Sequence, residues 1–229
     1  MTNIGNRIFT TIERPSKGLV EQFRGIPSSN IGDIMNRLYC MREYIRPMGK
    51  TSSVVGIAFT VKVPDGDNVF LHRALDLAEP GDVIVVDGNG CLTRSLMGEI
   101  MFTYAQNKGI AGFVLDGAIR DVDALEALDI PVYAVGVTPQ GPYKNGPGEI
   151  NVPVACGGQV VMPGDILVGD GDGVCVIRAE DAEKIVKLAR GKFGEELRIL
   201  ESYRKNGNDT ENHQRTYTAV TDRIETYYY

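Results

Sequence analysis

An arginine and an aspartate are adjacent at the end of an apolar stretch, where together they could bind an anionic substrate and a metal. Residues 109–121 read Gly-Ile-Ala-Gly-Phe-Val-Leu-Asp-Gly-Ala-Ile-Arg-Asp and end in Arg120 and Asp121. Open α/β sheets bind ligands at the carboxyl ends of their strands, where a guanidinium clamps an anion and a carboxylate holds a divalent cation. We expect the chemistry there. The alternative is a turn in which Asp121 caps the next helix and Arg120 forms a surface ion pair.

A second segment has the composition of an anion site. Asp87-Gly88-Asn89-Gly90 follows an apolar strand and leads through Ser95 to Gly98 and Glu99. Glycine lets backbone N–H groups approach an anion, and a helix start adds positive dipole character. The full G-x-G-x-x-G pattern is absent, which disfavours NAD and FAD, and an ordinary strand-to-helix turn is the alternative. If the fold brings Glu99 near Asp121, the two carboxylates would suit magnesium or manganese.

His72 and Lys144 are secondary candidates for substrate contacts. His72 follows apolar Phe70 and Leu71 on a predicted helix, so a packed structural histidine is the alternative. Lys144 lies in a stretch rich in glycine and proline, where it could reach a second substrate carboxylate or remain solvated.

Composition limits the class of protein. The chain has 229 residues, of which 43% are hydrophobic and 24% charged, and this favours one domain at 1–205 followed by a polar tail at 206–229. A formal net charge of −6 argues against nucleic-acid binding. No apolar run approaches the roughly 18 residues of a membrane span, and the first 15 residues do not resemble a signal peptide. We therefore expect a cytoplasmic protein with no membrane or nucleic-acid partner.

Cysteine and histidine usage limits the metal chemistry. The four cysteines, at 40, 91, 156 and 175, show no C-x-x-C spacing, which favours reduced buried thiols over disulfides or a zinc site. The chain has two histidines, too few for a histidine-rich metal site.

The elements that must position these residues alternate between strand and helix over the first 135 residues. Apolar spacing and capping residues predict a helix that follows the N-cap cluster Ser28-Ser29-Asn30. They also predict helices at 69–78, 94–106 and 122–128, and strands at 54–63, 83–86, 113–115 and 132–135. This alternation predicts parallel β-α-β units. Short strands follow at 152–154, 160–161 and 166–168, and an amphipathic helix from 179 to about 203 would bury Ile185, Leu188, Ala189, Leu197 and Leu200.

A short sequence pattern occurs twice in the chain. Residues 80–90 resemble residues 163–173, each with a Pro-Gly-Asp turn, a short apolar strand and a glycine-rich exit. Shared turn chemistry accounts for the similarity, and we infer no duplication.

Several spaced motifs, taken in order, resemble those of the RraA-like family. The resemblance covers roughly residues 29–177 and is far more specific than any single motif. It rests on Gly32-Asp33, His72-Arg73-Ala74-Leu75, Pro80-Gly81-Asp82, residues 87–90, Gly98-Glu99, residues 116–121, Lys144, Pro153-Val154, Cys156-Gly157-Gly158 and Pro163-Gly164-Asp165.

The resemblance implies a swivelling β/β/α domain of the α/β class, with a mixed, partly parallel sheet core and a C-terminal helix. It also implies a homotrimer or a hexamer made of two trimers, with active sites at subunit contacts. In the family aldolases, the residues matching Arg120 and the N–H groups of Ile100 and Met101 bind a pyruvate unit. The aspartate matching Asp121 holds Mg²⁺ or Mn²⁺, and an acidic residue matching Glu99 acts through water.

Two departures from the family pattern are visible. The family aldolases often have aspartate where this chain has Glu99, and an acid where it has Ala124. Glu99 should alter the outer metal shell without abolishing it, whereas Asp123 lies one residue too early on the predicted helix to replace the missing acid.

The family includes class II aldolases that cleave 4-hydroxy-4-methyl-2-oxoglutarate or 4-carboxy-4-hydroxy-2-oxoadipate, and the ribonuclease E inhibitor RraA. The resemblance therefore implies a metal-dependent aldolase that releases pyruvate, with oxaloacetate decarboxylation as a side activity because both reactions form the same enolate. A non-catalytic protein that binds and inhibits a ribonuclease is the alternative. Lys62 and Lys144 also leave a Schiff-base mechanism open, although nothing in the sequence would lower a lysine pKa.

Overall fold

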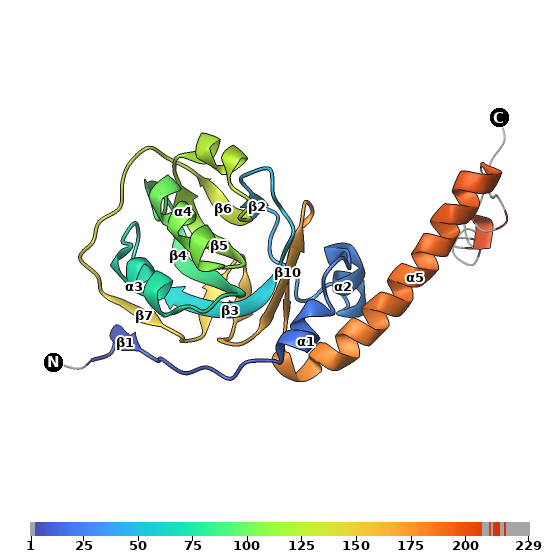
Figure 1. Ribbon diagram of the computed structural model, residues 1–229, viewed down its shortest axis with the longest axis horizontal. Coiled ribbons are helices and arrows are strands. Elements are labelled where there is room, and N and C mark those ends of the chain that lie inside the picture. Colours follow the sequence, from blue (N-terminus) through green and yellow to red (C-terminus); the bar gives the residue numbers. More distant parts are fainter. Residues whose placement is uncertain (1–2, 208–210, 212, 216–217, 219–229) are drawn as a thin grey trace, which may run out of the picture.

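A mixed sheet forms the centre of the computed structural model, which describes residues 3–207, 211, 213–215 and 218 (Figure 1). The strands run in the order β1-β7-β3-β4-β5-β6-β2, and the β10-β11 hairpin pairs with β3 beside this path. The strands are β1 (Asn6–Ile8), β2 (Arg46–Pro47), β3 (Val54–Lys62), β4 (Asp82–Ser95), β5 (Gly112–Ile119), β6 (Val132–Val137), β7 (Gly148–Ile150), β8 (Val154–Cys156), β9 (Gln159–Val161), β10 (Ile166–Asp170) and β11 (Gly173–Ile177). Strands β3 to β6 are parallel to one another, so the α/β class with a mixed sheet is confirmed.

The helices lie between these strands and after them. They are α1 (Lys17–Glu21), α2 (Ser28–Ile34), α3 (Val69–Leu77), α4 (Glu99–Lys108) and α5 (Ala182–Asn206), with short 3₁₀ turns η1 (Val122–Ala127) and η2 (Ala179–Asp181). None of the helices in the described part of the chain has the length and apolar character needed to cross a bilayer.

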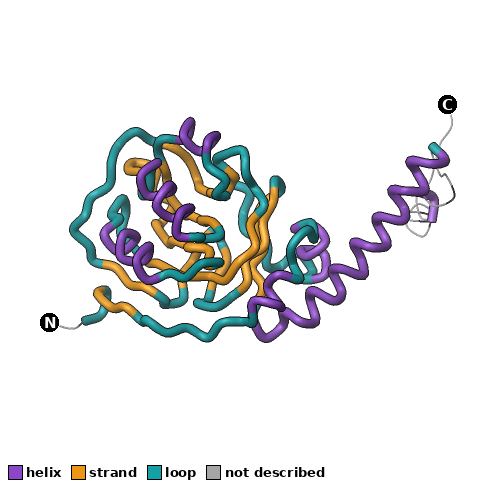
Figure 2. Tube along the Cα trace, viewed as in Figure 1, coloured by secondary structure: helices purple, strands orange, loops and turns teal. Residues whose placement is uncertain are grey.

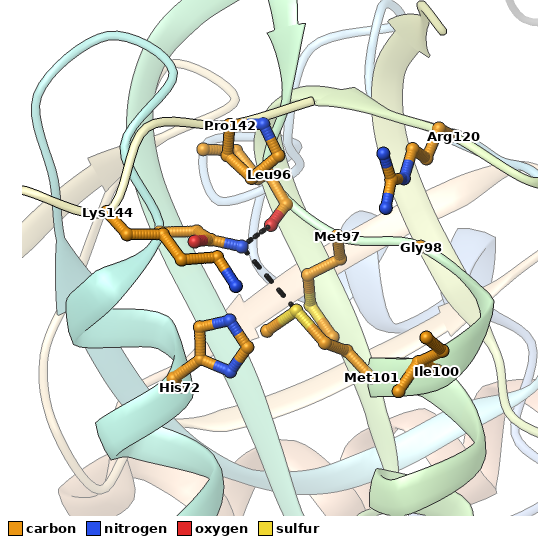
Figure 3. Close-up of a pocket in the computed structure, with 10 residues that line it drawn as sticks. His72, Leu96, Met97, Gly98, Ile100, Met101, Arg120, Pro142 and Lys144 are labelled. Carbon is orange, nitrogen blue, oxygen red and sulfur yellow. Dashed lines mark hydrogen bonds between the residues drawn. The ribbon is translucent and has the colours of Figure 1, made fainter. Parts of the chain in front are cut away.

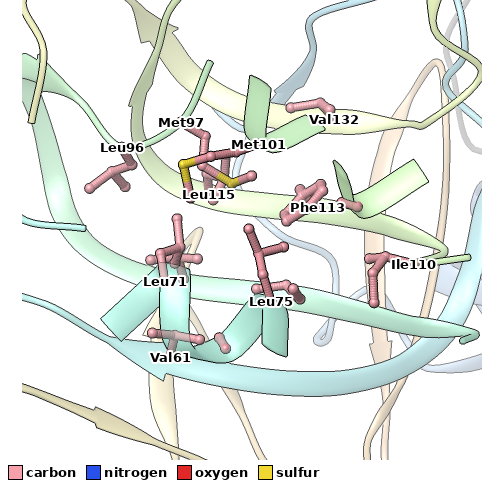
Figure 4. Packing of buried hydrophobic residues seen from close by; sticks show 14 of the residues in the cluster. Val61, Leu71, Leu75, Leu96, Met97, Met101, Ile110, Phe113, Leu115 and Val132 are labelled. Carbon is pink, nitrogen blue, oxygen red and sulfur yellow. The ribbon is translucent and has the colours of Figure 1, made fainter. Parts of the chain in front are cut away.

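Three apolar clusters pack against the sheet, and two of them cover the opposite faces of β5. Along β5, Phe113 and Leu115 point to one face and Val114 to the other, as the period of two in a strand requires. Leu71 and Leu75, one turn apart on α3, pack with Phe113 and Leu115 in the first cluster, to which α4 also contributes (Figure 4). The two helices thereby bring their N-terminal ends to the carboxyl-end edge of the parallel strands.

The predicted start of α4 is wrong. The expected helix at 94–106 begins only at Glu99, because β4 continues to Ser95. Both the backbone N and Oγ of Ser95 donate to Gln140 O, at 2.8 and 2.9 Å, and Ser95 pairs with Ala118 of β5. These contacts hold the segment extended and postpone the helix by one turn.

The glycine-rich segment 87–90 belongs to the same strand. Asp87 pairs with Asp116 across β4 and β5, and the register shifts before Cys91. A Cβ at Gly88 would lie 2.8 Å from Asp116 O, so glycine is needed there for strand packing. Neither the predicted anion loop nor the alternative strand-to-helix turn describes this segment: its glycines lie within a bulged strand.

The predicted caps of α2 are also wrong. The helix starts at Ser28 itself, so Ser28 and Asn30 lie within it. The backbone N and Oγ of Ser28 donate to the Asp170 carboxylate, both at 2.7 Å, and Asn30 Nδ2 donates to Glu196 at 2.7 Å. The polar groups that we expected to cap the helix locally form hydrogen bonds with residues distant in the sequence instead.

The C-terminal helix α5 extends well beyond the sheet (Figures 1 and 2). Only Ala182, Val186 and Ala189, in its first turns, are buried. Leu188, Leu197 and Leu200, which we predicted to be buried, are 46%, 46% and 45% exposed. Most of the predicted 206–229 tail lies outside the described residues.

The two copies of the repeated sequence pattern form equivalent turns. Asp82 Oδ2 accepts a hydrogen bond from Glu79 N, and Asp165 Oδ2 accepts one from Met162 N, both at 2.8 Å. The strands that follow, β4 and β10, both pair with β3. The similarity is consistent with shared turn chemistry.

Candidate active site

A small cavity of about 140 Å³ opens where α3, α4 and the end of β5 meet (Figure 3). Its volume is below the roughly 300–1,000 Å³ typical of sites for drug-sized ligands, which suits an acid of a few carbons. The cavity is lined by Asn68, His72, Leu96, Met97, Gly98, Ile100, Met101, Arg120, Pro142 and Lys144.

The turn after β5 directs Arg120 and Asp121 to the start of α4. Arg120 N donates to Met97 O at 3.0 Å, which fixes the turn against the preceding segment. Asp121 has φ 58° and ψ 39°, a left-handed conformation that turns its carboxylate back toward Glu99. Its Oδ2 accepts a hydrogen bond from Glu99 N at 3.1 Å and lies 3.4 Å from Arg120 Nε. Asp121 thus contacts the first N–H of α4 and makes no side-chain cap on η1. The cap in the alternative prediction is therefore wrong, whereas its surface ion pair of Arg120 is present, with Asp121 as the partner.

Gly98 makes this close approach possible. A Cβ at this position would clash with Asp121 Oδ2 and would lie 2.9 Å from Arg120 Cγ and 3.0 Å from Arg120 Nε. The φ of Gly98 is −150°, so the requirement concerns space and not backbone conformation. Glycine is therefore needed because two site side chains lie directly against the backbone.

The carboxylate groups at the rim have the donor set for a hydrated cation. The Asp121 side chain is 43% exposed, and Glu99, also exposed, is the first residue of α4. Among the described residues, no group of three or more His, Cys, Asp or Glu side chains is arranged to hold a metal. Mg²⁺ commonly keeps several waters and binds through one or two carboxylates together with its substrate. Asp121, with Glu99 nearby, fits that mode of binding.

The opposite wall carries two buried polar atoms that lack protein partners. Within the described residues, neither His72 Nε2 nor Asn68 Oδ1 has a hydrogen-bond partner, although Asn68 Nδ2 donates to Leu96 O at 2.8 Å. Burial, and then the positive charge of Lys144, lower the pKa of His72 below its usual 6.5. The neutral form of His72 is therefore favoured near pH 7, and both unpartnered atoms belong to residues that line the cavity.

A network of hydrogen bonds holds the loop that carries Lys144. Asp67, 3% exposed, accepts hydrogen bonds through Oδ2 from Asn145 N at 2.6 Å and Gly146 N at 3.0 Å. Arg94 donates to the Tyr143 hydroxyl at 2.7 Å and lies over its ring. These contacts on both sides of Lys144 order the loop beside the cavity.

The cavity combines positive charge at two places with an apolar floor. Figure 3 shows Arg120 and Lys144 on opposite sides, with Met97 and Met101 between them. Two cations across so small a space can bind two anionic groups of one ligand, and the apolar surface between them excludes water and strengthens both contacts.

Most of the predicted site residues come together here. Gly98, Ile100, Met101, Arg120, His72 and Lys144 line the cavity, with Glu99 and Asp121 at the adjoining turn. The Ile100 side chain is 83% exposed, and the Met101 N–H donates to Gly98 O at 3.0 Å.

Other residues depart from the sequence-based expectation. The 87–90 segment is not among the lining residues. Lys62 is not among them either and forms an ion pair with buried Asp87. Asn68 and Pro142 were missed: an asparagine just before a helix predicts a cap, and nothing in the sequence near Pro142 distinguishes it from other loop prolines.

The fold and this site define a member of a known family. A family model described as RraA-like, Aldolase/RraA, matches residues 28–176. A protein of Halalkalibacterium halodurans named "Putative 4-hydroxy-4-methyl-2-oxoglutarate aldolase" is 44% identical over 173 residues, covering 76% of this chain and 82% of its own. The chain therefore belongs to the RraA-like family.

Solved structures agree with this membership. Streptomyces coelicolor RraAS2, described as an unusual member of the RNase ES inhibitor RraA family, is 30% identical with a TM-score of 0.73, covering 84% of this chain and 98% of its own. The RNA-processing inhibitor RraA from Thermus thermophilis is 30% identical with a TM-score of 0.61, covering 66% of this chain and 91% of its own.

Proposed function

We propose that this protein is a divalent-metal-dependent aldolase that cleaves a 4-hydroxy-2-oxo dicarboxylic acid to pyruvate and a second oxo acid. Substrates of the 4-hydroxy-4-methyl-2-oxoglutarate or 4-carboxy-4-hydroxy-2-oxoadipate type fit this description, and oxaloacetate decarboxylation would be a side activity. The observation that carries the proposal is the pair of cations, Arg120 and Lys144, across one small cavity beside the Asp121 carboxylate.

The chain's own residues would bind the two ends of such a substrate. Arg120 would hold the pyruvate half through charge-assisted hydrogen bonds, and the exposed ammonium of Lys144 would attract the distal carboxylate. Gly98 and Ile100 would form the wall along the pyruvate unit. The apolar surface between the cations excludes water and strengthens the contact with Lys144. A substrate without a second anionic group would lack this contact and should lose binding energy.

The reaction breaks the C3–C4 bond, so that its electron pair passes to C3 and gives the enolate of pyruvate, while the C4 hydroxyl loses its proton. A divalent metal, when bound at Asp121 with Glu99 nearby, would stabilise the negative charge on the C2 oxygen. Arg120 would add positive charge on the same side. His72, which lines the cavity and whose lowered pKa favours its neutral form, would hold the C4 hydroxyl while an ordered water takes the proton.

Pyruvate release from a panel of oxo acids tests the proposal. Purified protein should release pyruvate from 4-hydroxy-4-methyl-2-oxoglutarate and slowly from oxaloacetate. EDTA should abolish both activities, and Mg²⁺ or Mn²⁺ should restore them. Full activity in EDTA, or covalent trapping of substrate by borohydride, would contradict the metal-dependent proposal and favour a lysine mechanism.

The rival function is inhibition of a ribonuclease. It is favoured by the 30% identity to the structure described as an RNA-processing inhibitor and to the one described as an unusual member of the RNase ES inhibitor RraA family. An acidic protein of net charge −6 could bind a basic partner. Absence of turnover on every oxo acid, with ribonuclease capture that is lost at high salt, would favour this function.

A homotrimer, or a hexamer of two trimers, is part of the proposal. Leu92, Ile100 and Val137 are apolar side chains at least half exposed, and Ile100 lines the cavity. Apolar groups exposed beside a site suit a subunit contact. Light scattering should give three or six chains per particle, and a monomer active at all concentrations would contradict this part.

A further inference from the structure

Two of the four cysteines lie in direct contact, although they are 135 residues apart in the sequence. Cys40 lies in the segment between α2 and β2, and Cys175 lies in the middle of β11. They face each other as an antiparallel bridge, and their sulfur atoms are 3.7 Å apart. Neither cysteine lines the proposed active site, so this pair is independent of the aldolase proposal.

The backbone geometry around the pair suits a disulfide. Met41 N donates to Val174 O at 2.9 Å, and Val176 N donates to Tyr39 O at 3.0 Å. These bonds flank Cys40 and Cys175, which makes them a non-hydrogen-bonded pair, for which the Cα–Cα distance is about 4.5 Å. Disulfides occur at Cα separations of roughly 4.4–6.8 Å, so the bond requires movement of the side chains and little of the backbone.

The two thiols differ in access and acidity. Cys175 is only 2% exposed, and Cys40 is half-buried. The hydrogen bond between the two thiols lowers the pKa of Cys40 to about 7, against the opposing effects of burial and of the Asp33 charge. The same hydrogen bond, together with burial, raises the pKa of Cys175. Cys40 therefore has the properties of an attacking thiolate, and Cys175 those of a resolving thiol.

The remaining cysteines provide an internal contrast. Cys91 is 8% exposed, and Cys156 is fully buried, with a pKa raised by burial. No Sγ–Sγ contact involving either of them is found among the described residues. An oxidant that reacts by access and acidity should therefore select Cys40.

We propose that Cys40 and Cys175 form a redox-active pair that hydroperoxides convert to an intramolecular disulfide. The Cys40 thiolate attacks one oxygen of hydrogen peroxide and breaks the O–O bond, which gives a sulfenic acid and, with one proton, water. The Cys175 thiol then displaces that hydroxyl group, which forms the S–S bond and releases a second water. Two thiols lose two electrons in total, and one peroxide is reduced to two waters.

The disulfide would connect the segment after α2 to the β10-β11 hairpin. It would close a loop of more than 100 residues in the unfolded chain, where a crosslink removes the most conformational entropy. The oxidised protein should therefore unfold at a temperature about 5–15 °C higher than the reduced protein. The cavity should be unaffected, since its lining residues include neither cysteine.

Thiol counting and peptide mapping test the proposal on the full chain. The reduced protein is treated at pH 7.5 with a small excess of hydrogen peroxide, and free thiols are then counted under denaturing conditions. The count should fall from four to two, peptides containing Cys40 and Cys175 should be joined, and dithiothreitol should restore all four thiols. The rate should follow the thiolate of Cys40, with a half-maximum near pH 7.

Matched variants complete the test. Cys91→Ser should still lose two thiols, whereas Cys40→Ser should keep all three. If Cys40→Ser fails to fold, Cys175→Ser should leave Cys40 as a sulfenic acid that a dimedone probe labels. Retention of four thiols, a crosslink between two chains, or oxidation of Cys40 beyond sulfenic acid without linkage to Cys175 would each overturn the proposal.

Discussion

Replacement of Gly98 by alanine tests whether the close approach of α4 to the Arg120-Asp121 turn is needed for catalysis. The added methyl would lie 2.9 Å from Arg120 Cγ and would clash with Asp121 Oδ2. Arg120 must then retreat by about 0.5 Å to reach an ordinary contact of 3.4 Å, and Asp121 by more. The hydrogen bond from Glu99 N to Asp121 would be lost or lengthened.

The expected effect on activity is large compared with the effect on stability. A misplacement of about 1 Å in a site costs roughly 10²-fold in rate, so Gly98→Ala should lower kcat/KM for pyruvate release by about 10- to 100-fold. The same crowding should lower the free energy of unfolding by about 1–3 kcal/mol. The concentration of Mg²⁺ needed for half-maximal activity should rise because Asp121 has moved.

Two controls separate these effects. Gly49→Ala introduces a comparable contact, 2.9 Å from Leu125 Cβ, at a position that does not line the cavity, so it should lower stability and leave kcat/KM within about twofold. Gly191→Ala on α5 meets open space and should stabilise the helix by about 0.5–1 kcal/mol. The assay is steady-state pyruvate release alongside thermal unfolding. Wild-type kcat/KM and metal response in Gly98→Ala would refute the reasoning.

Three further predictions concern charge. Lys144→Met should raise KM for a dicarboxylic substrate by about tenfold or more with little change in kcat, as expected for a lost charge-assisted contact; unchanged KM would remove Lys144 from the site. Because burial and Lys144 lower the pKa of His72, the acid limb of the pH profile of kcat/KM should lie below pH 6.5 and should vanish in His72→Gln. An acid limb that persists in His72→Gln would belong to another group. Burial raises the pKa of Asp116 above its usual 3.8, so the folded state holds this proton more tightly and loses stability as pH rises through the folded pKa. Asp116→Asn should therefore show a smaller fall in Tm between pH 4 and 7 than wild type, whereas an identical fall would exclude Asp116 as its source.

The sequence predicted the strands and the main helices because they depend on local patterning. The apolar run in β5 and the helical spacing of apolar residues in α3 need no distant partner to be recognised. The predicted boundaries of helices and strands were wrong where a hydrogen bond to a distant residue determines them. Ser95 extends β4 because Gln140 O accepts its N–H, and Ser28 lies inside α2 because Asp170 accepts its polar groups. Neither contact leaves a signal in a local window.

The candidate site shows the same division. Arg120, Asp121 and Gly98 were recognisable from residue type, position after a strand and family resemblance. The segment 87–90 was misinterpreted because glycine occurs in a bulged strand as well as in an anion loop. Only the pairing with β5, which leaves no room for a Cβ at Gly88, distinguishes the two. Asn68 was missed because its unpartnered Oδ1 is a property of the packed cavity, which the sequence does not contain.

The most direct test of the proposed function compares Arg120→Ala with wild type in kcat/KM for pyruvate release from 4-hydroxy-4-methyl-2-oxoglutarate at saturating Mg²⁺. Arg73→Ala serves as the matched control, because Arg73 is 55% exposed and does not line the cavity. Loss of a guanidinium bound to the reacting unit should lower kcat/KM by at least about 10²-fold in Arg120→Ala, with Tm unchanged and with Arg73→Ala as active as wild type. Equal activity of Arg120→Ala and Arg73→Ala would contradict the central claim that this cavity binds and cleaves the oxo acid.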